Sequence, residues 1–440
     1  MSNGEGRLYR STLARRASAA VSMTDSLTGA RVAVVVLGDL GRSPRMLRHA
    51  AALLDCGAAV DLVGYPGAPL PAALRDDARL AVHHLPGPRL GRRHALPRAV
   101  FLAYSAGRVA SSGARLAVAL RRLPKPDLIL VQNPPALPTL AIAPLVARAR
   151  GVPLVIDWHN FAYTQLAATL GKTNRLLRPA RAMERSLARG AAAHLCVSAA
   201  MRAALAADWG IAAAVVLRDH PAVFAAPAAR GAARARLEAL LDLPLDGCEP
   251  AALVISPTSW SADEDTDLLL DALGRLEAAA DATAPRLICL LTGDGPRRAA
   301  FESAVARRAW QRVVVRTTWL TPEDYPALLT GADLGLCLHR STSGVDLPMK
   351  VADLHGAALP VCAFDYGPCL GEVLTAEERA VGFTHAAGLA TRLRQLLNGF
   401  PHAPGLDVLR TAVADAPRQT WAEGWRAEAL PLLRSAMSQR

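Results

Sequence analysis

Short apolar runs recur along the chain, and most of them end in glycine or polar residues before a helix-like stretch begins. Residues 31–37 read Arg-Val-Ala-Val-Val-Val-Leu and precede a turn with two glycines, and residues 252–255 and 286–291 follow the same design. Continuous apolar runs are typical of strands that are buried on both faces of a parallel sheet. Parallel strands need long, usually helical, crossovers, so the pattern predicts an α/β fold.

The pattern occurs twice, which predicts two Rossmann-like domains, because 440 residues are too many for one ordinary core. We expect a polar, basic and disordered segment at 1–30, a first domain at 31–225 and a second at 250–405. Pro, Ala and Gly mark a linker at 226–249 with one short helix. Residues 406–440 are a helical segment, with Trp421 and Trp425 on the helix of 418–433.

The chain is strongly basic, with a formal net charge of +12, and its composition of 52% hydrophobic and 20% charged residues is that of a globular protein. A basic protein favours an anionic partner such as a nucleotide sugar, a pyrophosphate-linked acceptor or a phospholipid surface. Aromatic residues make up only 5% and the basic residues are scattered, which argues against nucleic acid.

Seven cysteines form neither a zinc pattern nor an even disulfide set, so we interpret most of them as core residues of a reducing compartment. No run of about 18 apolar residues is present, so the sequence predicts a cytoplasmic protein that contacts a membrane only peripherally. A basic amphipathic stretch from Arg92 to Arg122 can lie on such a membrane, or it can be an ordinary helix pair that flanks the sheet.

Residues 341–362 predict a loop, a helix and a buried strand. Asp346 can cap a helix that starts near Leu347 with Pro348 in its first turn, and Gly356 ends it. The start of a helix suits a diphosphate, and Lys350 adds a full charge there. Asp353 shares a helical face with Lys350 and can accept sugar hydroxyls, although the two can also form a solvated ion pair.

The acidic run Asp263-Glu264-Asp265-Thr266-Asp267 begins another helix, where negative charge is favoured, and such a run is usually a solvated face. We interpret it as a complement to the helix dipole rather than as a metal site. Two strand ends in the first half are also polar, namely Gln132-Asn133-Pro134-Pro135 and Asp157-Trp158-His159-Asn160. Ligands bind beyond the carboxyl ends of parallel strands, so we expect these two tips to face one crevice.

The string from Ser343 to Asp353 resembles the donor motif of the chitobiosyldiphosphodolichol β-mannosyltransferase family, which belongs to the GT-B glycosyltransferases. The strings Leu37-Gly38-Asp39-Leu40-Gly41-Arg42-Ser43-Pro44-Arg45 and Ser256-Pro257-Thr258-Ser259-Trp260, together with the two polar tips, resemble that family as well. The resemblance implies a GT-B fold, in which two Rossmann-like domains face each other across a cleft and a C-terminal helix crosses back to the N-terminal domain. The chain departs from this family at its N-terminus. Residues 1–30 are polar and basic, whereas eukaryotic members usually begin with a membrane anchor.

The resemblance implies an inverting transfer of mannose from GDP-mannose to GlcNAc2-pyrophosphoryl-polyprenol, such as dolichol, with a β-1,4 linkage, in lipid-linked oligosaccharide synthesis. No cofactor is expected, and no metal is strictly required. Expected partners are GDP-mannose, the lipid acceptor, an anionic membrane and other glycosyltransferases of the pathway; in a eukaryote the site would be the cytosolic face of the endoplasmic reticulum.

The site residues implied by the resemblance fall into three groups. His159 would be the base toward the acceptor hydroxyl, oriented by Asp157 or another carboxylate, or else a structural histidine. Lys350 would hold the leaving diphosphate. The donor would be bound by Ser256, Thr258, Ser259, Gly293, Gly295, Trp319, Ser343, Gly344, Leu347, Pro348, Met349, Lys350 and Asp353. The acceptor and phosphate loop would comprise Gly38, Asp39, Gly41, Arg42, Arg45 and Asn133.

Several of these assignments have an alternative. Trp319 can contact the guanine or can pack in the core, and Arg42 and Arg45 can bind phosphate or can be solvated charges. The protein could also be another GT-B transferase with a different nucleotide sugar and a bacterial glycan acceptor, or a non-catalytic nucleotide-sugar-binding partner. An oxidoreductase is disfavoured because the full Gly-x-Gly-x-x-Gly pattern and its downstream acid are missing.

Overall fold

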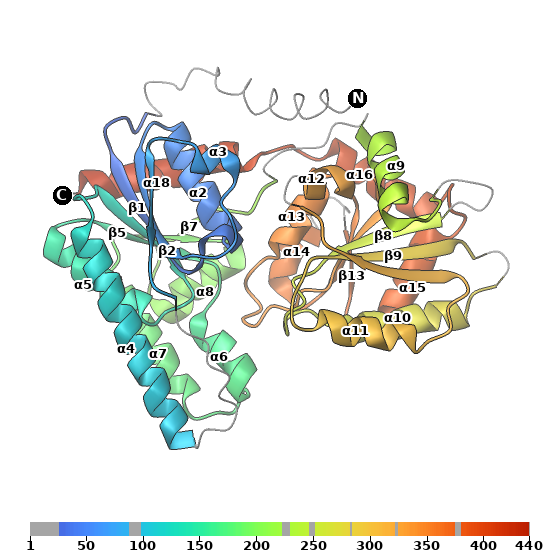
Figure 1. Cartoon of the computed structure of the whole chain (residues 1–440), viewed down its shortest axis with the longest axis horizontal. Helices are drawn as coiled ribbons and strands as arrows, with labels where there is room; N and C mark the ends of the chain where they lie inside the picture. Colours follow the sequence, from blue (N-terminus) through green and yellow to red (C-terminus); the bar gives the residue numbers. More distant parts are fainter. Residues whose placement is uncertain are drawn as a thin grey trace. The chain divides into compact units, whose positions relative to one another are not determined.

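The structure is a computed structural model, and it describes residues 26–87, 98–221, 229–245, 251–281, 284–321, 324–374 and 380–439. Within these ranges the chain forms two sheets, one of seven strands and one of six (Figure 1). The predicted α/β class is therefore confirmed. The disorder predicted for residues 1–30 lies outside the described residues as far as residue 25.

The seven-stranded sheet has the order β3-β2-β1-β4-β5-β6-β7. Its strands are β1 (Arg31–Asp39), β2 (Ala59–Tyr65), β3 (Leu80–His84), β4 (Leu128–Asn133), β5 (Leu154–Trp158), β6 (Ala193–Cys196) and β7 (Val215–Val216). In parallel register, Val32 lies opposite Val60 on one side and Leu128 on the other. The apolar run at 31–37 is thus a central strand, as expected for residues that must be buried on both faces.

Helices and one 3-10 turn (η3) connect these strands. They are η3 (Leu40–Arg42), α2 (Pro44–Asp55), α3 (Ala72–Arg75), α4 (Arg98–Arg122), α5 (Thr139–Arg150), α6 (Ala162–Leu170), α7 (Leu177–Ala188) and α8 (Ala199–Trp209). The basic stretch predicted at 92–122 is one helix from Arg98 onward, not a pair, and its residues 92–97 lie outside the described part. In the cyan part of Figure 1, α4 is visibly longer than the helices around it.

The six-stranded sheet has the order β10-β9-β8-β11-β12-β13. Its strands are β8 (Ala251–Pro257), β9 (Arg286–Thr292), β10 (Val313–Thr318), β11 (Leu334–Cys337), β12 (Val361–Phe364) and β13 (Ala380–Phe383). The helices around them are α9 (Ala229–Leu241), α10 (Thr266–Ala278), α11 (Arg298–Ala306), α12 (Asp324–Leu329), α13 (Met349–Gly356), α14 (Pro368–Leu374) and α15 (Ala386–Leu397).

Alternate residues of β8 supply two separate apolar cores. Ala252 and Val254 pack with residues of α10 and α15, whereas Leu253 and Ile255 pack with residues of α9 and α13. Successive side chains of a strand point to opposite faces of the sheet, so both faces are covered by helices. Every residue of β8 is buried, which explains its unbroken apolar sequence.

The C-terminal segment is helical, as predicted. It contains α16 (Pro404–Asp415), α17 (Trp421–Gly424), a π-helical turn called η4 (Trp425–Ala429) and α18 (Leu430–Ser438). Trp421 and Trp425 are both buried. On α18, Arg434 donates a hydrogen bond to the Ser26 carbonyl at 2.7 Å, which confirms that the C-terminal helix returns to the N-terminal part of the chain.

The chain divides into two compact units, one of residues 1–131, 142–154 and 433–440 and the other of residues 132–141 and 155–432. The domain boundaries expected from the sequence stay a prediction, as does the cleft.

The predicted linker contains α9 at 229–241, and its residues 222–228 and 246–250 lie outside the described part. Six cysteines are buried and free, as expected; Cys248 is not described. Among the described helices, none combines the length and the apolar composition that a membrane span requires.

Candidate functional site

The first glycine-bearing turn follows β1 and is closed by its own chain. The Asp39 carboxylate accepts a hydrogen bond from the Ala68 amide at 3.0 Å, and a Cβ on Gly41 would lie only 2.2 Å from the Ala68 carbonyl oxygen. Gly41 is therefore required for close packing of the backbone. Arg42 is largely exposed and lies 3.7 Å from Asp39, whereas Arg45 is only 2% exposed. Gly38 has no similarly close neighbour, and the phosphate roles of this loop stay predictions.

The turn after β5 carries the predicted base. His159 Nε2 lies 2.8 Å from Asp157 Oδ2, and Asp157 is fully buried at the end of the strand. The carboxylate accepts a hydrogen bond from the ring Nε2–H, so the neutral tautomer has its hydrogen on Nε2 and presents Nδ1 as the acceptor. The expectation that Asp157 orients His159 is confirmed, and the role of His159 as base stays a prediction.

Asn133 ends β4 and is buried beside the same turn. Its Nδ2 donates to Glu184 Oε1 at 2.8 Å and to the Asn160 carbonyl at 3.3 Å, while the His159 amide donates to the Asn133 carbonyl at 2.8 Å. The two polar strand tips are thus hydrogen-bonded to each other, as expected for neighbouring parallel strands. Burial raises the pKa of Glu184, but its bonds from Asn133 and from the Ala162 and Tyr163 amides favour the carboxylate.

The loop after β8 lies against the glycine turn after β9. A Cβ on Gly293, whose φ is +106°, would lie 1.9 Å from the Thr258 carbonyl oxygen, and a Cβ on Gly295 would lie 2.2 Å from the Ser259 carbonyl oxygen. Both positions therefore require glycine, and the two turns are packed backbone to backbone. Ser256 is buried with no partner for its hydroxyl among the described residues, and Thr258 Oγ1 donates to the Ser256 carbonyl at 3.1 Å.

Lys350 lies in the first turn of α13 and forms an ion pair with Glu264. Glu264 is 1% exposed, and its other oxygen accepts hydrogen bonds from the Ser259 amide at 2.7 Å and the Trp260 amide at 2.9 Å. Burial lowers the pKa of Lys350 to about 8, although nearby Asp263 and Asp353 oppose that shift. The alternative of a solvated Lys350–Asp353 pair is wrong for Lys350, because a buried carboxylate holds its amine.

The acidic run at 263–267 is only partly what its sequence suggests. The run begins α10, as predicted, and Asp265 caps this helix by accepting from the Leu268 amide at 2.9 Å. Glu264, by contrast, points into the protein rather than lying on a solvated face, and Asp263 binds His339 at 3.1 Å. The solvated face was wrong for Glu264, because a run of charges shows no direction for any single side chain, whereas the Asp263 side chain is 37% exposed.

Asp346 does not cap α13, which was predicted wrongly. The helix starts at Met349 with Pro348 as its N-cap and without a capping side chain. The Asp346 carboxylate instead binds within its own loop, with Ser341, Ser343 at 3.0 Å and His339 Nε2 at 3.2 Å as partners. In the same loop Gly344 has φ +74°, and its amide donates to Ser341 Oγ at 2.7 Å.

His339 bridges two carboxylates, those of Asp263 and Asp346. Burial by itself would lower the pKa of His339, but the hydrogen bonds and charges of these carboxylates outweigh it and raise the pKa to about 9. The imidazolium in turn holds the pKa of Asp263 well below its usual range. His339 is therefore a cation near neutral pH, and it fixes the 341–346 loop to the start of the 263–267 run.

Asn160 and Ser198 connect the loops after β5 and β6 to the 341–346 loop. Asn160 Nδ2 donates to Thr342 Oγ1 and to Asp346 Oδ1, each at 3.2 Å, and the Ser198 hydroxyl donates to the Val345 carbonyl. Glu372 accepts hydrogen bonds from the amides of Ala199 and Ala200 at 2.9 and 2.8 Å. These contacts place the His159 turn and the Lys350 loop in one connected set of residues.

Two further predicted donor residues are accessible. Trp319 follows β10 and is 56% exposed, so the alternative that it packs in the core is wrong. Asp353 is half-buried one turn after Lys350 on α13. Leu347 and Pro348 precede that helix, which starts at Met349 rather than near Leu347 as expected. Their contacts with a donor stay predictions.

Sequence reasoning missed Glu264, His339 and Asp346 as organising residues of the site. Two signals were available in the sequence. Glu264 is an acid four residues after Ser259-Trp260, and His339 follows the strand that precedes the 341–346 loop. Across the described residues, no three His, Cys, Asp or Glu side chains are grouped so that they could hold a metal ion.

Comparison with known proteins gives the family. A family model described as "Glycosyl transferase 4-like domain" matches residues 41–221. A mouse protein (Mus musculus) named chitobiosyldiphosphodolichol beta-mannosyltransferase is 36% identical, over 91% of this chain and 88% of its own. The human protein (Homo sapiens) of the same name is 35% identical, over 91% and 92%. An Arabidopsis thaliana protein named UDP-glycosyltransferase TURAN is 34% identical, over 93% and 98%.

Solved structures agree on the fold. An α,α-trehalose 6-phosphate synthase from Burkholderia multivorans superposes with a TM-score of 0.64 at 15% identity, over 94% of this chain and 100% of that one. Anabaena HepE, solved with UDP and glucose, gives a TM-score of 0.57 at 15% identity, over 93% and 98%. These likenesses show a GT-B fold. With the sequence identities above, they establish that the chain belongs to the chitobiosyldiphosphodolichol β-mannosyltransferase family of glycosyltransferases.

Proposed function

We propose that the protein moves mannose from GDP-mannose to GlcNAc2-pyrophosphoryl-polyprenol, such as dolichol, with inversion and a β-1,4 linkage. Membership of a family whose relatives carry the name chitobiosyldiphosphodolichol β-mannosyltransferase supports this reaction. The reaction serves lipid-linked oligosaccharide synthesis, in which the protein acts at a membrane surface from the cytosolic side.

The observation that carries the proposal is the assembly centred on Glu264. Its carboxylate binds Lys350 and the amides of Ser259 and Trp260, so a lysine at a helix start and a hydroxyl-bearing loop are held together. The leaving group of the reaction is a nucleoside diphosphate. A fixed cation and the free amides of a helix start stabilise the charge that develops on such a group.

On the acceptor side, His159 Nδ1 takes the proton of the attacking hydroxyl. The Asp157 carboxylate holds Nε2–H at 2.8 Å, which selects the tautomer and stabilises the imidazolium that forms. The hydroxyl oxygen then attacks the anomeric carbon of mannose as the bond to the diphosphate oxygen breaks. One displacement of this kind inverts the configuration.

We propose that the reaction needs no metal ion and no other cofactor. The charge on the leaving diphosphate is met by Lys350 and by the helix start. Ser256, Thr258 and Ser259 add hydroxyls and backbone groups beside it.

The reaction is tested by incubating the protein with radiolabelled GDP-mannose and a synthetic GlcNAc2-pyrophosphoryl lipid, followed by linkage analysis of the product. We expect a β-1,4-linked mannose. Binding of GDP-mannose without product from any polyprenyl acceptor would instead identify a non-catalytic binding protein.

A second candidate is a GT-B transferase that uses another nucleotide sugar, and the name of one relative, UDP-glycosyltransferase TURAN, favours including it. The same assay with UDP-glucose and UDP-GlcNAc separates the two. The proposal holds when unlabelled GDP-mannose competes with the label and neither UDP-sugar does.

A further inference from the structure

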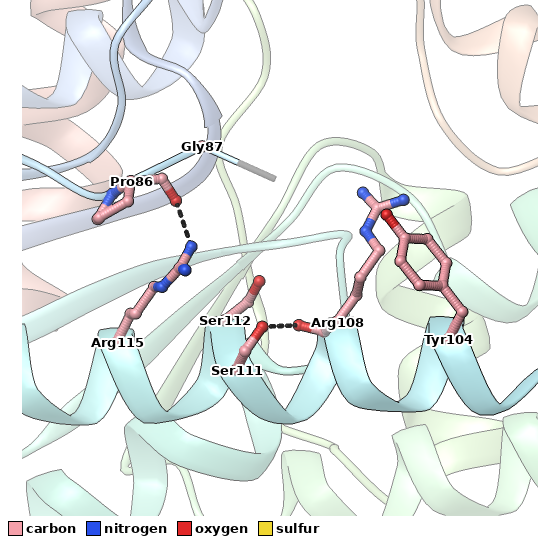
Figure 2. A pocket seen from close by; sticks show the side chains of 7 residues that line it. All are labelled: Pro86, Gly87, Tyr104, Arg108, Ser111, Ser112 and Arg115. Carbon is pink, nitrogen blue, oxygen red and sulfur yellow. Dashed lines mark hydrogen bonds between the residues drawn. The ribbon is translucent and has the colours of Figure 1, made fainter. Parts of the chain in front are cut away.

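The described residues before β4 hold a pocket of about 390 Å³ on one side of α4, separate from the residues discussed above. It is lined by Pro86, Gly87, Tyr104, Arg108, Ser111, Ser112 and Arg115 (Figure 2). Positions 104, 108, 112 and 115 are spaced by three or four residues, so their side chains leave the helix on one face.

Two guanidinium groups flank Ser112 in this pocket, as Figure 2 shows. The Arg108 guanidinium lies over the Tyr104 ring, 5.8 Å from its centroid, and among the described residues this group has no hydrogen-bond or ion-pair partner. Arg115 gives one N–H to the Pro86 carbonyl at 3.1 Å, which leaves its other donors available. The Ser111 hydroxyl is used within the helix, on the Arg108 carbonyl at 3.0 Å. Both arginines are therefore pre-positioned by neutral groups, and no carboxylate of the described part of the chain forms an ion pair with either.

The surrounding sequence contains only positive charge. Residues 78–126 include no Asp or Glu, whereas they contain ten basic residues, namely Arg79, Arg89, Arg92, Arg93, Arg98, Arg108, Arg115, Arg121, Arg122 and Lys125. Excess charge of one sign over such a length attracts an extended anionic surface rather than one small ion. The single aromatic ring of the pocket is covered by Arg108, so a nucleotide base has no ring on which to stack.

We propose that this pocket binds the phosphate of an anionic phospholipid headgroup and thereby attaches the protein to a membrane surface. Arginine suits this role because its planar group offers several donors to phosphate oxygens, and the Ser112 hydroxyl between the two adds another. The inference rests on the proposed function only because an enzyme with a lipid-linked acceptor must act at a membrane surface.

The test is flotation of the full chain with vesicles of phosphatidylcholine, with and without phosphatidylglycerol, in the absence of donor and acceptor. We expect binding to the anionic vesicles alone. The variant Arg108→Gln/Arg115→Gln should bind about 10-fold to 30-fold more weakly, since each arginine near an anionic surface contributes comparably. A control, Arg392→Gln/Arg394→Gln on α15, removes the same charge from two other exposed residues and should bind as wild type does.

Equal weakening of both double variants would show that only net charge matters and would overturn the proposal that this pocket binds the headgroup. Unchanged binding of the α4 variant would overturn it as well. Arg108→Lys/Arg115→Lys keeps the charge without the planar group and should recover only part of the binding. Thermal unfolding shows whether each variant is folded.

A soluble short-chain GlcNAc2-pyrophosphoryl acceptor and inorganic phosphate, each at matched ionic strength, complete the experiment. Release from the vesicles by the acceptor, but not by phosphate, would assign the pocket to the acceptor diphosphate and reject the phospholipid. Transfer to the short-chain acceptor, measured separately, should persist in the α4 variant. Loss of vesicle binding with retained transfer thus separates this inference from the proposed function.

Discussion

The turn after β1 and the loops around Lys350 both contain glycines, but different charged groups bind to their backbones. Both follow buried strands, and both need glycine for close backbone contact, at Gly41 in the first and at Gly293 and Gly295 in the second. In the first, the Asp39 carboxylate accepts the hydrogen bond of the Ala68 amide, so this amide is not available to an anion. In the second, a lysine is held at a helix start. A glycine turn therefore shows only where two backbone segments can approach closely. The neighbouring charges decide whether an anion can bind there.

The largest effect that tests this contrast is expected from Lys350→Met. We expect turnover to fall about 10²-fold to 10³-fold, the usual cost of removing one group that stabilises developing negative charge. Arg42→Gln in the first turn should change turnover less than about threefold, since Arg42 is largely exposed and 3.7 Å from its partner. Steady-state transfer rates measure both. Equal losses would remove the distinction between the two turns.

Lys350→Met also leaves Glu264 buried without its partner, which destabilises the fold. The double variant Glu264→Gln/Lys350→Met removes both charges and should recover much of the stability without recovering turnover. Urea unfolding beside the rate measurement separates the two effects. Recovery of turnover in the double variant would contradict the role of Lys350.

Gly293→Ala should be the most damaging substitution of a glycine. The new Cβ would lie 1.9 Å from the Thr258 carbonyl oxygen at a φ of +106°, so we expect a loss of about 2–4 kcal/mol in the free energy of unfolding. Gly344→Ala shares a positive φ but has open space around it, and should cost about 1 kcal/mol. Denaturant titrations compare the two, and equal losses would mean that the packing of the two turns is not tight.

Asp157→Asn tests the acceptor side. The amide keeps the shape but cannot hold the imidazolium, so we expect the turnover number to fall about 10-fold to 10²-fold while donor binding is unchanged. His159→Ala should lose at least as much, and the double variant should lose little more. Additive losses in the double variant would show that the two residues do not act as a unit.

His339 predicts a pH dependence of stability. Its pKa of about 9 in the folded protein exceeds the unfolded value of 6.5, so the folded state binds the extra proton in this range. The stabilisation is complete below pH 6.5 and is lost as the pH rises toward 9. The free energy of unfolding should fall by roughly 2 kcal/mol between pH 6.5 and 8.

Above pH 8 the lowered pKa of Lys350, about 8, acts in the opposite direction, so the lower window is the informative one. His339→Gln should lack the decline between pH 6.5 and 8, as measured by urea unfolding at each pH. A variant that declines like wild type would place the titration elsewhere.

The smallest effect is expected from metal removal. We propose that Lys350 and the start of α13 supply the positive charge for the diphosphate, so excess EDTA should leave the transfer rate unchanged. A loss that Mg²⁺ or Mn²⁺ restores would show that these protein groups are insufficient.

Much of this architecture could be predicted from the sequence, for local reasons. Unbroken apolar runs such as 251–255 are stable only between two helical layers, and the strings around Gly293 and Pro348 place turns by backbone geometry alone. The pairing of Asp157 with His159 was accessible because the two residues are only two positions apart on one strand end.

Only the tertiary structure decided which charges meet. Glu264 and Lys350 are 86 residues apart, and Asp263 reaches His339 across 76, so no local pattern links them. The same limit explains why Asp346, a good helix cap by sequence, serves its own loop and His339 instead. The order of residues determined the strands, helices and turns of this protein, because those depend on neighbours in the chain. The folded chain determined the direction of each buried charge, because that depends on partners brought from far away.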